Sequence, residues 1–403
     1  MTDGIKEEFV TEGDIGFVFY PRRRDGRVFE ALGRAEAARA MNFHKTVPGY
    51  NKTPLVSLPG LASKLHIAEF MVKDESKRFG LGAFKALGCS YAMGCEIAER
   101  LGLAPEDLSY EALSGQNARE KLGPLTFVAA TDGNHGNGVA WMSKLLGHRA
   151  VIYLPRGSST ERLERIRGNG AKAEITDLSY DDTVRSARRE ADENGWITIQ
   201  DTAWTGYEKI PLLIMKGYTT IALEIDEEIS RPPTHIFLQA GVGSFSAAIL
   251  GYYAAVYGDD RPVSVIVEPN RADCVFMTAK AADGMLHSVS GDMDTIMAGL
   301  ACGEPNPMAW DILSGLADAF VSCPDRVSEC GMRMLGNPVF DRTRIESGES
   351  GAVTAGLAAL LMEPEYERIR SKLGITSDSR ILCISTEGAT DIESYRSIVW
   401  GSL

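Results

Sequence analysis

The sequence predicts an α/β fold of two domains, each a mainly parallel sheet flanked by helices. Two observations lead to this expectation. Short β-branched and apolar runs alternate along the chain with longer amphipathic patterns, which is the order of a parallel sheet covered by helices on both faces. The chain has 403 residues, of which 44% are hydrophobic and 24% charged. This is an ordinary globular composition, and the length fits two domains or three at most.

The individual elements follow from the spacing of apolar residues. Short apolar runs bounded by turn residues predict strands, and apolar residues at helical spacing predict helices. The predicted strands are Ala68–Val72, Leu125–Ala130, Ala150–Leu154, Lys172–Ile175, His235–Ala240, Val263–Val267 and Ile381–Ser385. The predicted helices include Phe84–Leu101, Asn137–Leu146, Thr160–Arg167, Asp181–Asn194, Phe245–Tyr257 and Ala352–Met362.

Two breaks in this pattern suggest the domain limits. The polar segment Gly102–Gly123 contains no apolar strand run, and a second break lies near Asp201–Pro211. We therefore expect a small domain of residues 93–203 embedded in a large cofactor-binding domain of residues 1–92 and 204–403.

Charge and cysteine content narrow the classes of partner. The net charge of -13 and the pI near 5.1 repel polyphosphate, so we expect neither nucleic acid nor an anionic membrane as a partner. The cysteines are odd in number and lack CxxC spacing, which favours reduced thiols and a cytoplasmic location. The N-terminus lacks a signal-peptide pattern, and the most apolar stretch, Ile236–Val256, contains polar residues and glycines. The histidines show no metal-ligand spacing, so we expect no metal.

Two glycine-rich turns each join a predicted strand to a predicted helix. In Thr131–Gly138, the glycines permit positive φ and close approach of the backbone, and the N–H groups that open the following helix favour an anion. The turn of Gly241, Val242, Gly243 and Ser244 has the same character and suits a phosphate. Ser246 stands where a dinucleotide fingerprint requires glycine, so a smaller phosphate-bearing group fits better. Tight packing is the structural alternative for both turns.

Lys85 lies in RFGLGAFKALG, between a glycine-rich approach and an apolar helix. Apolar surroundings disfavour the ammonium form and so favour the neutral amine that Schiff-base chemistry needs. A lysine that extends to solvent is the structural alternative. The predicted strand at 381–385 ends in Ser385 and Thr386, whose hydroxyls can hydrogen-bond a heterocycle nitrogen or close a turn.

Five segments carry a family resemblance through their order along the chain: RFGLGAFKALG, TDGNHGNG, GVGSFSA, ESGESGAV and STEGATD. Together they resemble the tryptophan-synthase-β-like (fold type II) pyridoxal-phosphate enzymes, over nearly the whole chain from Asn51. The segments IQDTAWTGYEKIP and DTIMAGLACGEPNP look like the branch of the family that releases ammonia from 2,3-diaminopropionate. Dehydratases and synthases of the family show Ser or Thr and Gly before Phe-Lys, and Ser at the head of the asparagine loop. This chain has Gly82-Ala83 and Thr131-Asp132 there instead.

The resemblance implies a cofactor site for pyridoxal 5'-phosphate. Lys85 would hold the cofactor as a Schiff base, and Asn134 would bond its phenolic oxygen. Gly241, Val242, Gly243 and Ser244 would cradle the phosphate. Ser385 or Thr386 would face the pyridine nitrogen, and the sequence does not choose between them. Glu349 would lie near the cofactor without an assigned role, and the family suggests a homodimer.

The expected reaction is the α,β-elimination of 2,3-diaminopropionate to pyruvate and two ammonia, a step of amino-acid catabolism. Lys85 would act as base on one face of the cofactor. Asp132 would act on the other face, so that D and L substrates are both accepted. Asp201 would bind the second ammonium as a charge-assisted pair.

Other loop residues would contact the substrate less directly. Thr131, Gly133, His135 and Tyr180 complete the expected substrate-binding set. Asp132 has a structural alternative as a turn residue, and Asp201 as a cap or turn residue.

Two competing functions remain open from sequence. The first keeps the cofactor and makes the chain a serine or threonine dehydratase or a β-replacement enzyme. The presence of both Asp132 and Asp201 weighs against it, since two carboxylates suit a dicationic diamine better than a hydroxy amino acid. The second is a non-catalytic α/β protein that binds an amino acid or nucleotide, which would have no use for Lys85.

Overall fold

The computed structural model describes residues 7–20 and 30–401. Their contacts divide the chain into two compact units. The first unit comprises Met1–Gly33, Thr53–Lys77 and Glu224–Leu403, and the second comprises Arg34–Lys52 and Arg78–Leu223. The domain limits expected at residues 92 and 203 stay a prediction.

The first unit is built on one mixed sheet. Among the described residues its strand order is β1-β2-β11-β10-β9-β12-β4-β3. The run from β11 to β4 is parallel, and β1, β2 and β3 join antiparallel at the two edges. The strands are β1 (Glu8–Glu12), β2 (Ile15–Phe19), β3 (Leu55–Ser57), β4 (Glu69–Asp74), β9 (His235–Gln239), β10 (Val263–Pro269), β11 (Ala319–Cys323) and β12 (Arg380–Ser385).

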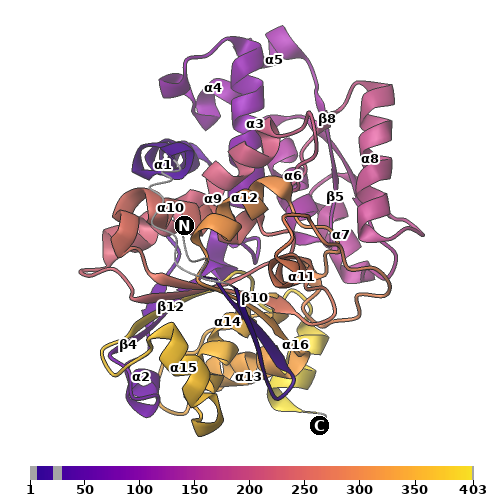
Figure 1. Ribbon diagram of the computed structural model, residues 1–403. Helices are drawn as coiled ribbons and strands as arrows, with labels where there is room; N and C mark the ends of the chain where they lie inside the picture. Colours follow the sequence, from indigo (N-terminus) through magenta and orange to yellow (C-terminus); the bar gives the residue numbers. More distant parts are fainter. Residues whose placement is uncertain (1–6, 21–29, 402–403) are drawn as a thin grey trace, which may run out of the picture. The chain divides into compact units, whose positions relative to one another are not determined.

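Helices cover both faces of this sheet. Figure 1 shows α13 and α14 on one face and α10 and α12 on the other. The helices of the first unit are α2 (Pro59–Lys64), α10 (Ser244–Tyr257), α11 (Cys274–Ala281), α12 (Pro307–Leu316), α13 (Asp325–Gly336), α14 (Glu349–Leu360), α15 (Glu367–Leu373) and α16 (Ile392–Trp400). Short 3-10 helices are η1 (Glu30–Leu32), η2 (Glu75–Gly80, which continues into the second unit), η4 (Gly258–Asp260), η5 (Ala298–Leu300) and η6 (Pro364–Tyr366).

Small residues position α14 beneath the sheet. A Cβ on Gly331 of α13 would lie 2.1 Å from the Ala352 carbonyl oxygen, and one on Gly356 of α14 would lie 2.0 Å from that of Val327. Only glycine lets the two backbones approach so closely. The N-terminal turn of α14, which starts at Glu349, is thereby held by its packing against α13.

The second unit has a smaller, fully parallel sheet in the order β7-β6-β5-β8. Its strands are β5 (Thr126–Ala130), β6 (Arg149–Leu154), β7 (Lys172–Ile175) and β8 (Ile197–Thr198). Its helices are α1 (Arg34–Thr46), α3 (Ala86–Leu101), η3 (Pro105–Asp107), α4 (Tyr110–Ser114), α5 (Gln116–Leu122), α6 (Asn134–Leu146), α7 (Thr160–Gly168), α8 (Tyr180–Asn194) and most of α9 (Lys209–Glu228).

The predicted α/β class and all the predicted strands are present, the strands to within two residues at each end. Two helices begin earlier than expected, α6 at Asn134 and α14 at Glu349, because the glycines that suggested a turn lie inside the first helical turn. The strands β1, β2, β3, β8 and β11 and the helix α9 were not predicted. Pro211 suggested a break, yet it lies in the first turn of α9, where a missing N–H costs nothing.

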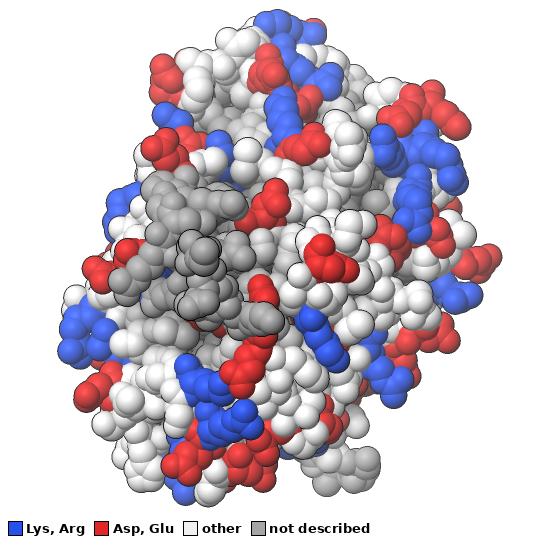
Figure 2. Space-filling model, in the orientation of Figure 1, with Lys and Arg blue, Asp and Glu red and all other residues white. Residues whose placement is uncertain are grey.

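Charged side chains of both signs are interspersed on the face shown in Figure 2. Exposed ion pairs such as Arg185–Asp182 (2.9 Å) and Arg333–Glu329 (3.0 Å) add little stability. Within residues 7–20 and 30–401, no helix is both long and apolar enough to cross a membrane. The same residues contain no cluster of His, Cys, Asp and Glu that could hold a metal ion.

Candidate active site

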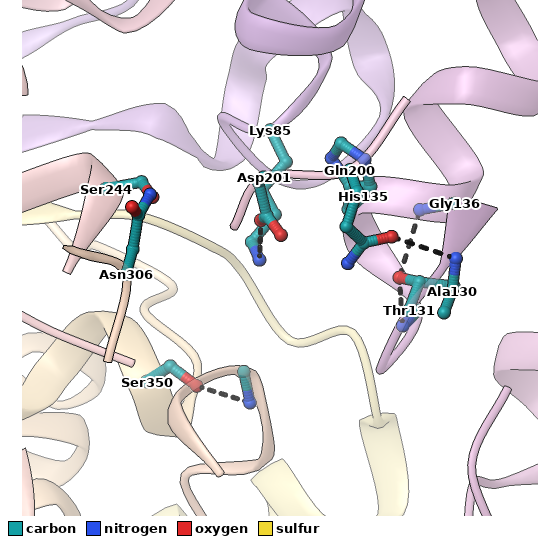
Figure 3. Close-up of polar contacts among 12 residues, drawn as sticks. Lys85, Ala130, Thr131, His135, Gly136, Gln200, Asp201, Ser244, Asn306 and Ser350 are labelled. Carbon is teal, nitrogen blue, oxygen red and sulfur yellow. Dashed lines mark hydrogen bonds and ion pairs between the residues drawn. The ribbon is translucent and has the colours of Figure 1, made fainter. Parts of the chain in front are cut away.

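Lys85 lies at the N-terminal end of α3, and its side chain is 17% exposed. The Nζ atom donates a hydrogen bond to Oδ2 of Asp201 at 3.0 Å, as Figure 3 shows. Phe84 is buried beside it and packs on the ring of Tyr218 with centroids 4.8 Å apart. The predicted apolar surroundings of Lys85 are thus present in the second unit. Asp201, which the sequence analysis assigned to the same site, contacts Lys85 directly.

The environment of Asp201 keeps its carboxyl ionised. Burial raises the pKa of this carboxyl, but the charge of Lys85, the charge of His135 and the hydrogen bond from Lys85 lower it, from the ordinary 3.8 to about 2. A buried carboxylate needs such a partner, because removing either charge would leave the other uncompensated in a poorly solvated site. Asp201 is therefore a permanent anion at neutral pH.

This low pKa predicts an acid-sensitive contribution to the stability of the cofactor-free protein. A depressed carboxyl pKa stabilises the fold above the unfolded value, near 3.8, and the stabilisation is lost as pH falls toward about 2. The stability advantage of the wild type over Asp201→Asn should fall by about 1 kcal/mol between pH 7 and pH 3. Urea unfolding of both stripped proteins at the two pH values measures it. An advantage that does not change with pH would contradict the assignment.

The asparagine loop, residues 131–138, is held by one hydroxyl. Thr131 Oγ1 accepts hydrogen bonds from the backbone N–H groups of Gly133 (2.9 Å) and Gly136 (3.0 Å). A Cβ on Gly136 would lie 2.4 Å from Thr131 Cγ2, so the loop tolerates no larger residue there. A Cβ on Gly138 would lie 3.1 Å from the Cα of Ala86. The start of α6 therefore packs directly against the residue that follows Lys85.

The polar side chains of the loop have defined partners. Arg165 donates to Asn134 Oδ1 at 2.9 Å, and Arg162 donates to the Asp132 carbonyl oxygen at 3.4 Å. The Asp132 side chain is half-buried. His135 donates from Nε2 to the Ile199 carbonyl oxygen at 2.7 Å, since a carbonyl can only accept. Its Nδ1 is buried without a hydrogen-bond partner among the described residues.

Gln200 connects the loop to Tyr180. Its Oε1 accepts from the Ala130 N–H at 3.1 Å, and its Nε2 donates to the Tyr180 hydroxyl at 3.1 Å. Figure 3 shows Gln200 and His135 close together at the end of β5. The structure therefore gathers the predicted residues of the second unit, Lys85, Thr131, Asp132, Gly133, Asn134, His135, Tyr180 and Asp201, around the ends of β5 and α3.

Tyr218 is a residue of this group that the sequence analysis missed. It is 1% exposed, on α9, and burial raises the pKa of its phenol well above 10, with a further rise from Asp201. The charges of Lys85 and Asp132 also act on it. A tyrosine in an unpredicted helix gave no sequence signal, so only the packing of α9 against α3 could reveal it.

In the first unit, the second glycine turn follows β9 and opens α10. Gly243 is the N-cap of α10 with φ at +96°, a conformation that favours glycine. A Cβ on Gly241 would lie 3.1 Å from Cys302 Sγ and 3.3 Å from Leu300 Cα. Asn306 donates from Nδ2 to Ser244 Oγ at 2.8 Å and from its backbone N–H to the Val242 carbonyl at 2.8 Å. The turn is thus held from behind by residues that the sequence analysis did not single out.

The two candidate hydroxyls at the end of β12 have different partners. Ser385 donates to Ser347 Oγ at 2.7 Å and lies 3.3 Å from the Glu387 carbonyl. Thr386 accepts from Gln239 Nε2 at 2.8 Å. The same amide nitrogen donates to the carbonyls of Ser350 (3.1 Å) and Ile384 (3.0 Å). Gln239 was also missed, although it is the polar end of the apolar run IFLQ.

Glu349 is buried at the first position of α14. Its Oε1 accepts from Ser394 Oγ at 2.6 Å, and its carbonyl accepts from Ser328 Oγ. Next to it, Ser350 Oγ accepts from the N–H of Gly299 at 3.1 Å.

The predicted site residues of the first unit lie at the carboxyl ends of β9 and β12 or at the start of α14. They are Gly241, Val242, Gly243, Ser244, Glu349, Ser385 and Thr386.

Residues 47–387 match the family of pyridoxal-phosphate dependent enzymes. Diaminopropionate ammonia-lyase of Escherichia coli is 47% identical over 380 residues, which are 93% of this chain and 94% of that protein. The chain belongs to the diaminopropionate ammonia-lyases of the pyridoxal-phosphate-dependent enzyme family. The Salmonella typhimurium enzyme of this family is 44% identical over 96% of this chain and 98% of its own. The family predicted from the five ordered segments is confirmed.

A solved structure of the family agrees with the fold. The crystal structure of diaminopropionate ammonia-lyase from Escherichia coli in complex with an aminoacrylate-PLP azomethine reaction intermediate superposes with a TM-score of 0.87 and 44% identity. The match covers 96% of this chain and 97% of that one. The predicted fold type II architecture is therefore confirmed.

The residues present fit pyridoxal phosphate. Gly241 and Gly243 make a turn that a Cβ would obstruct, and it opens a helix whose N-terminal N–H groups and dipole favour a phosphate. The partly buried Lys85 would supply the amine for the aldehyde, and Thr386 would supply a hydroxyl at the end of β12.

Proposed function

We propose that this protein catalyses the α,β-elimination of 2,3-diaminopropionate, as either enantiomer, with one water consumed and pyruvate and two ammonia released. The observation that carries the proposal is the partly buried ion pair between Lys85 and Asp201 in a chain that is 47% identical to a diaminopropionate ammonia-lyase. The pair places the Lys85 Nζ atom 3.0 Å from a carboxylate that is ionised at neutral pH. A diamine substrate requires a lysine amine that holds the cofactor and an anion that pairs with the second ammonium of the substrate.

Bound pyridoxal phosphate supplies an electron-withdrawing ring that stabilises the negative charge left when the substrate Cα loses its proton. Lys85 would hold the cofactor through its Nζ atom, and the same atom would take the Cα proton of the substrate from one face. Asp132, half-buried in the asparagine loop, takes it from the opposite face of the other enantiomer. The Asp201 carboxylate, which pairs with Lys85 in the cofactor-free protein, pairs with the β-ammonium of the bound substrate.

The remaining loop residues orient these groups. Because Arg165 holds Oδ1 of Asn134, its Nδ2 is the end that can donate to the cofactor's phenolic oxygen. Thr131 and Gly133 fix the loop backbone, and Tyr180 is positioned through Gln200. The Nδ1 atom of His135 is buried without a hydrogen-bond partner among the described residues, which suits a contact with the substrate.

We further propose that Thr386, rather than Ser385, faces the pyridine nitrogen. The Ser385 hydroxyl donates its hydrogen to Ser347. The Thr386 hydroxyl instead accepts a hydrogen bond from the side-chain amide nitrogen of Gln239, and this nitrogen cannot accept a hydrogen bond from Thr386. No described residue accepts the Thr386 hydroxyl hydrogen. Thr386→Val should therefore shift the visible absorption band of the bound cofactor and slow turnover by about tenfold to a hundredfold. Ser385→Ala is the matched control, and a larger shift in that variant would reverse the assignment.

A serine or threonine dehydratase is the second candidate function, and it shares the cofactor. Asp132 and Asp201 weigh against it, since a hydroxy amino acid carries no second ammonium for these carboxylates to bind.

We also propose, from the family resemblance and the free cysteines, a homodimer in the cytoplasm. Sedimentation of the holoenzyme at a monomer mass would contradict the dimer.

The function is tested by product formation from four substrates. The holoenzyme should convert D- and L-diaminopropionate to pyruvate, with two ammonia per pyruvate, far faster than D- or L-serine. Pyruvate is measured by coupled reduction and ammonia by coupled amination. A preference for serine would make the protein a dehydratase, and a purified protein that stays colourless after addition of pyridoxal phosphate would contradict the cofactor as well.

A further inference from the structure

Tyr207, to which the sequence analysis gave no role, lies in a tight turn after β8 and folds back onto that strand. Its backbone N–H donates to the Trp204 carbonyl oxygen at 2.8 Å, and Gly206 in the turn has φ at +85°, a conformation that favours glycine. The Tyr207 hydroxyl donates to the Thr198 carbonyl oxygen at 2.9 Å and accepts from the Gln200 N–H at 2.9 Å. One hydroxyl therefore holds two backbone groups.

These two backbone groups lie on the outer edge of the smaller sheet. In the described residues, β8 is an edge strand with β5 on one side only. Backbone groups of successive residues in an extended chain point to opposite sides. Ile199 faces β5, where its N–H donates to the Val128 carbonyl oxygen at 2.9 Å. The Thr198 carbonyl and the Gln200 N–H face outward, and the Tyr207 hydroxyl takes the place of a neighbouring strand, since it donates and accepts at once.

Stacking holds the Tyr207 ring in this position. The ring lies on that of Trp204 with centroids 4.2 Å apart and planes inclined by 11°. The guanidinium of Arg188, on α8, lies 4.8 Å from the centroid of the Trp204 ring, which is the geometry of a cation–π contact. The hydroxyl is thus aimed at β8 by its side-chain neighbours as well as by the turn.

Asp201 is the residue that directly follows the segment held by Tyr207. Its carboxylate points at Lys85, with 3.0 Å between the two charged atoms (Figure 3). A charge-assisted pair needs its atoms at hydrogen-bond distance, and a displacement of about 1 Å can cost about a hundredfold in rate. The direction of the carboxylate therefore depends on the backbone just before it, which Tyr207 fixes on its outer edge.

We infer that Tyr207 is a positioning residue for Asp201, whose hydroxyl fixes the edge of β8 and so directs the carboxylate at the second ammonium of the substrate. The inference rests on the proposed function, because it takes Asp201 to bind that ammonium. Tyr207 acts through the backbone of residues 198–200 and through Asp201, without a contact of its own to the substrate.

The experiment compares two substrates of the holoenzyme that differ in the group that leaves. Diaminopropionate carries a second ammonium, whereas β-chloroalanine loses chloride and carries none, and both yield pyruvate in a coupled assay. In Tyr207→Phe, KM for diaminopropionate should rise by about tenfold with kcat within about threefold. KM for the same enantiomer of β-chloroalanine should stay within about twofold, because this substrate makes no ammonium pair with Asp201.

Two further variants make the result specific. Tyr110→Phe is the matched control, because it also removes a tyrosine hydroxyl that donates to a backbone carbonyl, that of Leu145 at 3.1 Å. It should leave both KM values unchanged. Trp204→Leu removes the stacking partner and keeps the hydroxyl, so it should raise KM for diaminopropionate alone, by about threefold. This variant tests the inference even if Tyr207→Phe does not fold.

A double-mutant cycle tests whether Tyr207 acts through Asp201. If it does, adding Tyr207→Phe to Asp201→Asn should raise KM for diaminopropionate by less than about twofold beyond Asp201→Asn alone. Equal rises for the two substrates, or a full additional rise in the double variant, would overturn the inference and leave Tyr207 as a structural residue. A wild type that does not convert diaminopropionate would overturn the proposed function, and the inference with it.

Discussion

Replacing Lys85 with alanine should reduce elimination by about a thousandfold or more and abolish the visible absorption of the bound cofactor. The Nζ atom is both the covalent attachment point and the base on one face of the substrate, and no second lysine is placed beside Asp201 among the described residues. Coupled pyruvate assays and absorbance spectra of the purified variant measure the two losses.

Two controls make this result specific. Lys85→Arg keeps a cation opposite Asp201, so it should preserve the stability of the stripped protein while losing turnover and colour, because a guanidinium does not form the Schiff base. Lys172→Ala removes an exposed lysine of β7 and should change neither property. Full activity in Lys85→Ala would reject the proposed chemistry.

Replacing Asp132 with asparagine should slow turnover of one enantiomer of diaminopropionate by about a hundredfold to ten-thousandfold and leave the other within about threefold. The reason is geometric, since a base on one face of the cofactor can reach the Cα proton of only one enantiomer, and Lys85 serves the opposite face. Separate kcat and KM values for D and L substrate measure the effect.

The selectivity of the Asp132 effect distinguishes a base from a turn residue. Equal losses for both enantiomers would assign Asp132 to the shape of the loop, and no loss would remove it from the reaction. Asp177→Asn is the matched control, because Asp177 is an exposed aspartate of the same unit. Its substitution should affect neither enantiomer.

The amino-acid sequence was sufficient to predict the α/β class, seven of the strands and the family. Apolar patterns are local, so β4, β5, β6, β7, β9, β10 and β12 could be located without knowing what they pack against. The order of five glycine-containing segments identified the family because each segment needs a backbone conformation that few residues permit. Lys85, Asp201 and the two glycine turns were found on this basis.

Contacts between distant residues became visible in the folded chain and not before. The 3.0 Å contact of Lys85 with Asp201 joins residues that are 116 positions apart, and no local pattern encodes such a distance. Our proposal that Thr386 rather than Ser385 faces the pyridine nitrogen depended on the hydrogen bond from Gln239 to Thr386. These are hydrogen bonds between distant segments, and their donors and acceptors are assigned only when packing brings the segments together. Even the start of α6 needed the structure, because Gly136 and Gly138 suggest a turn locally, whereas packing against Thr131 and α3 keeps them helical.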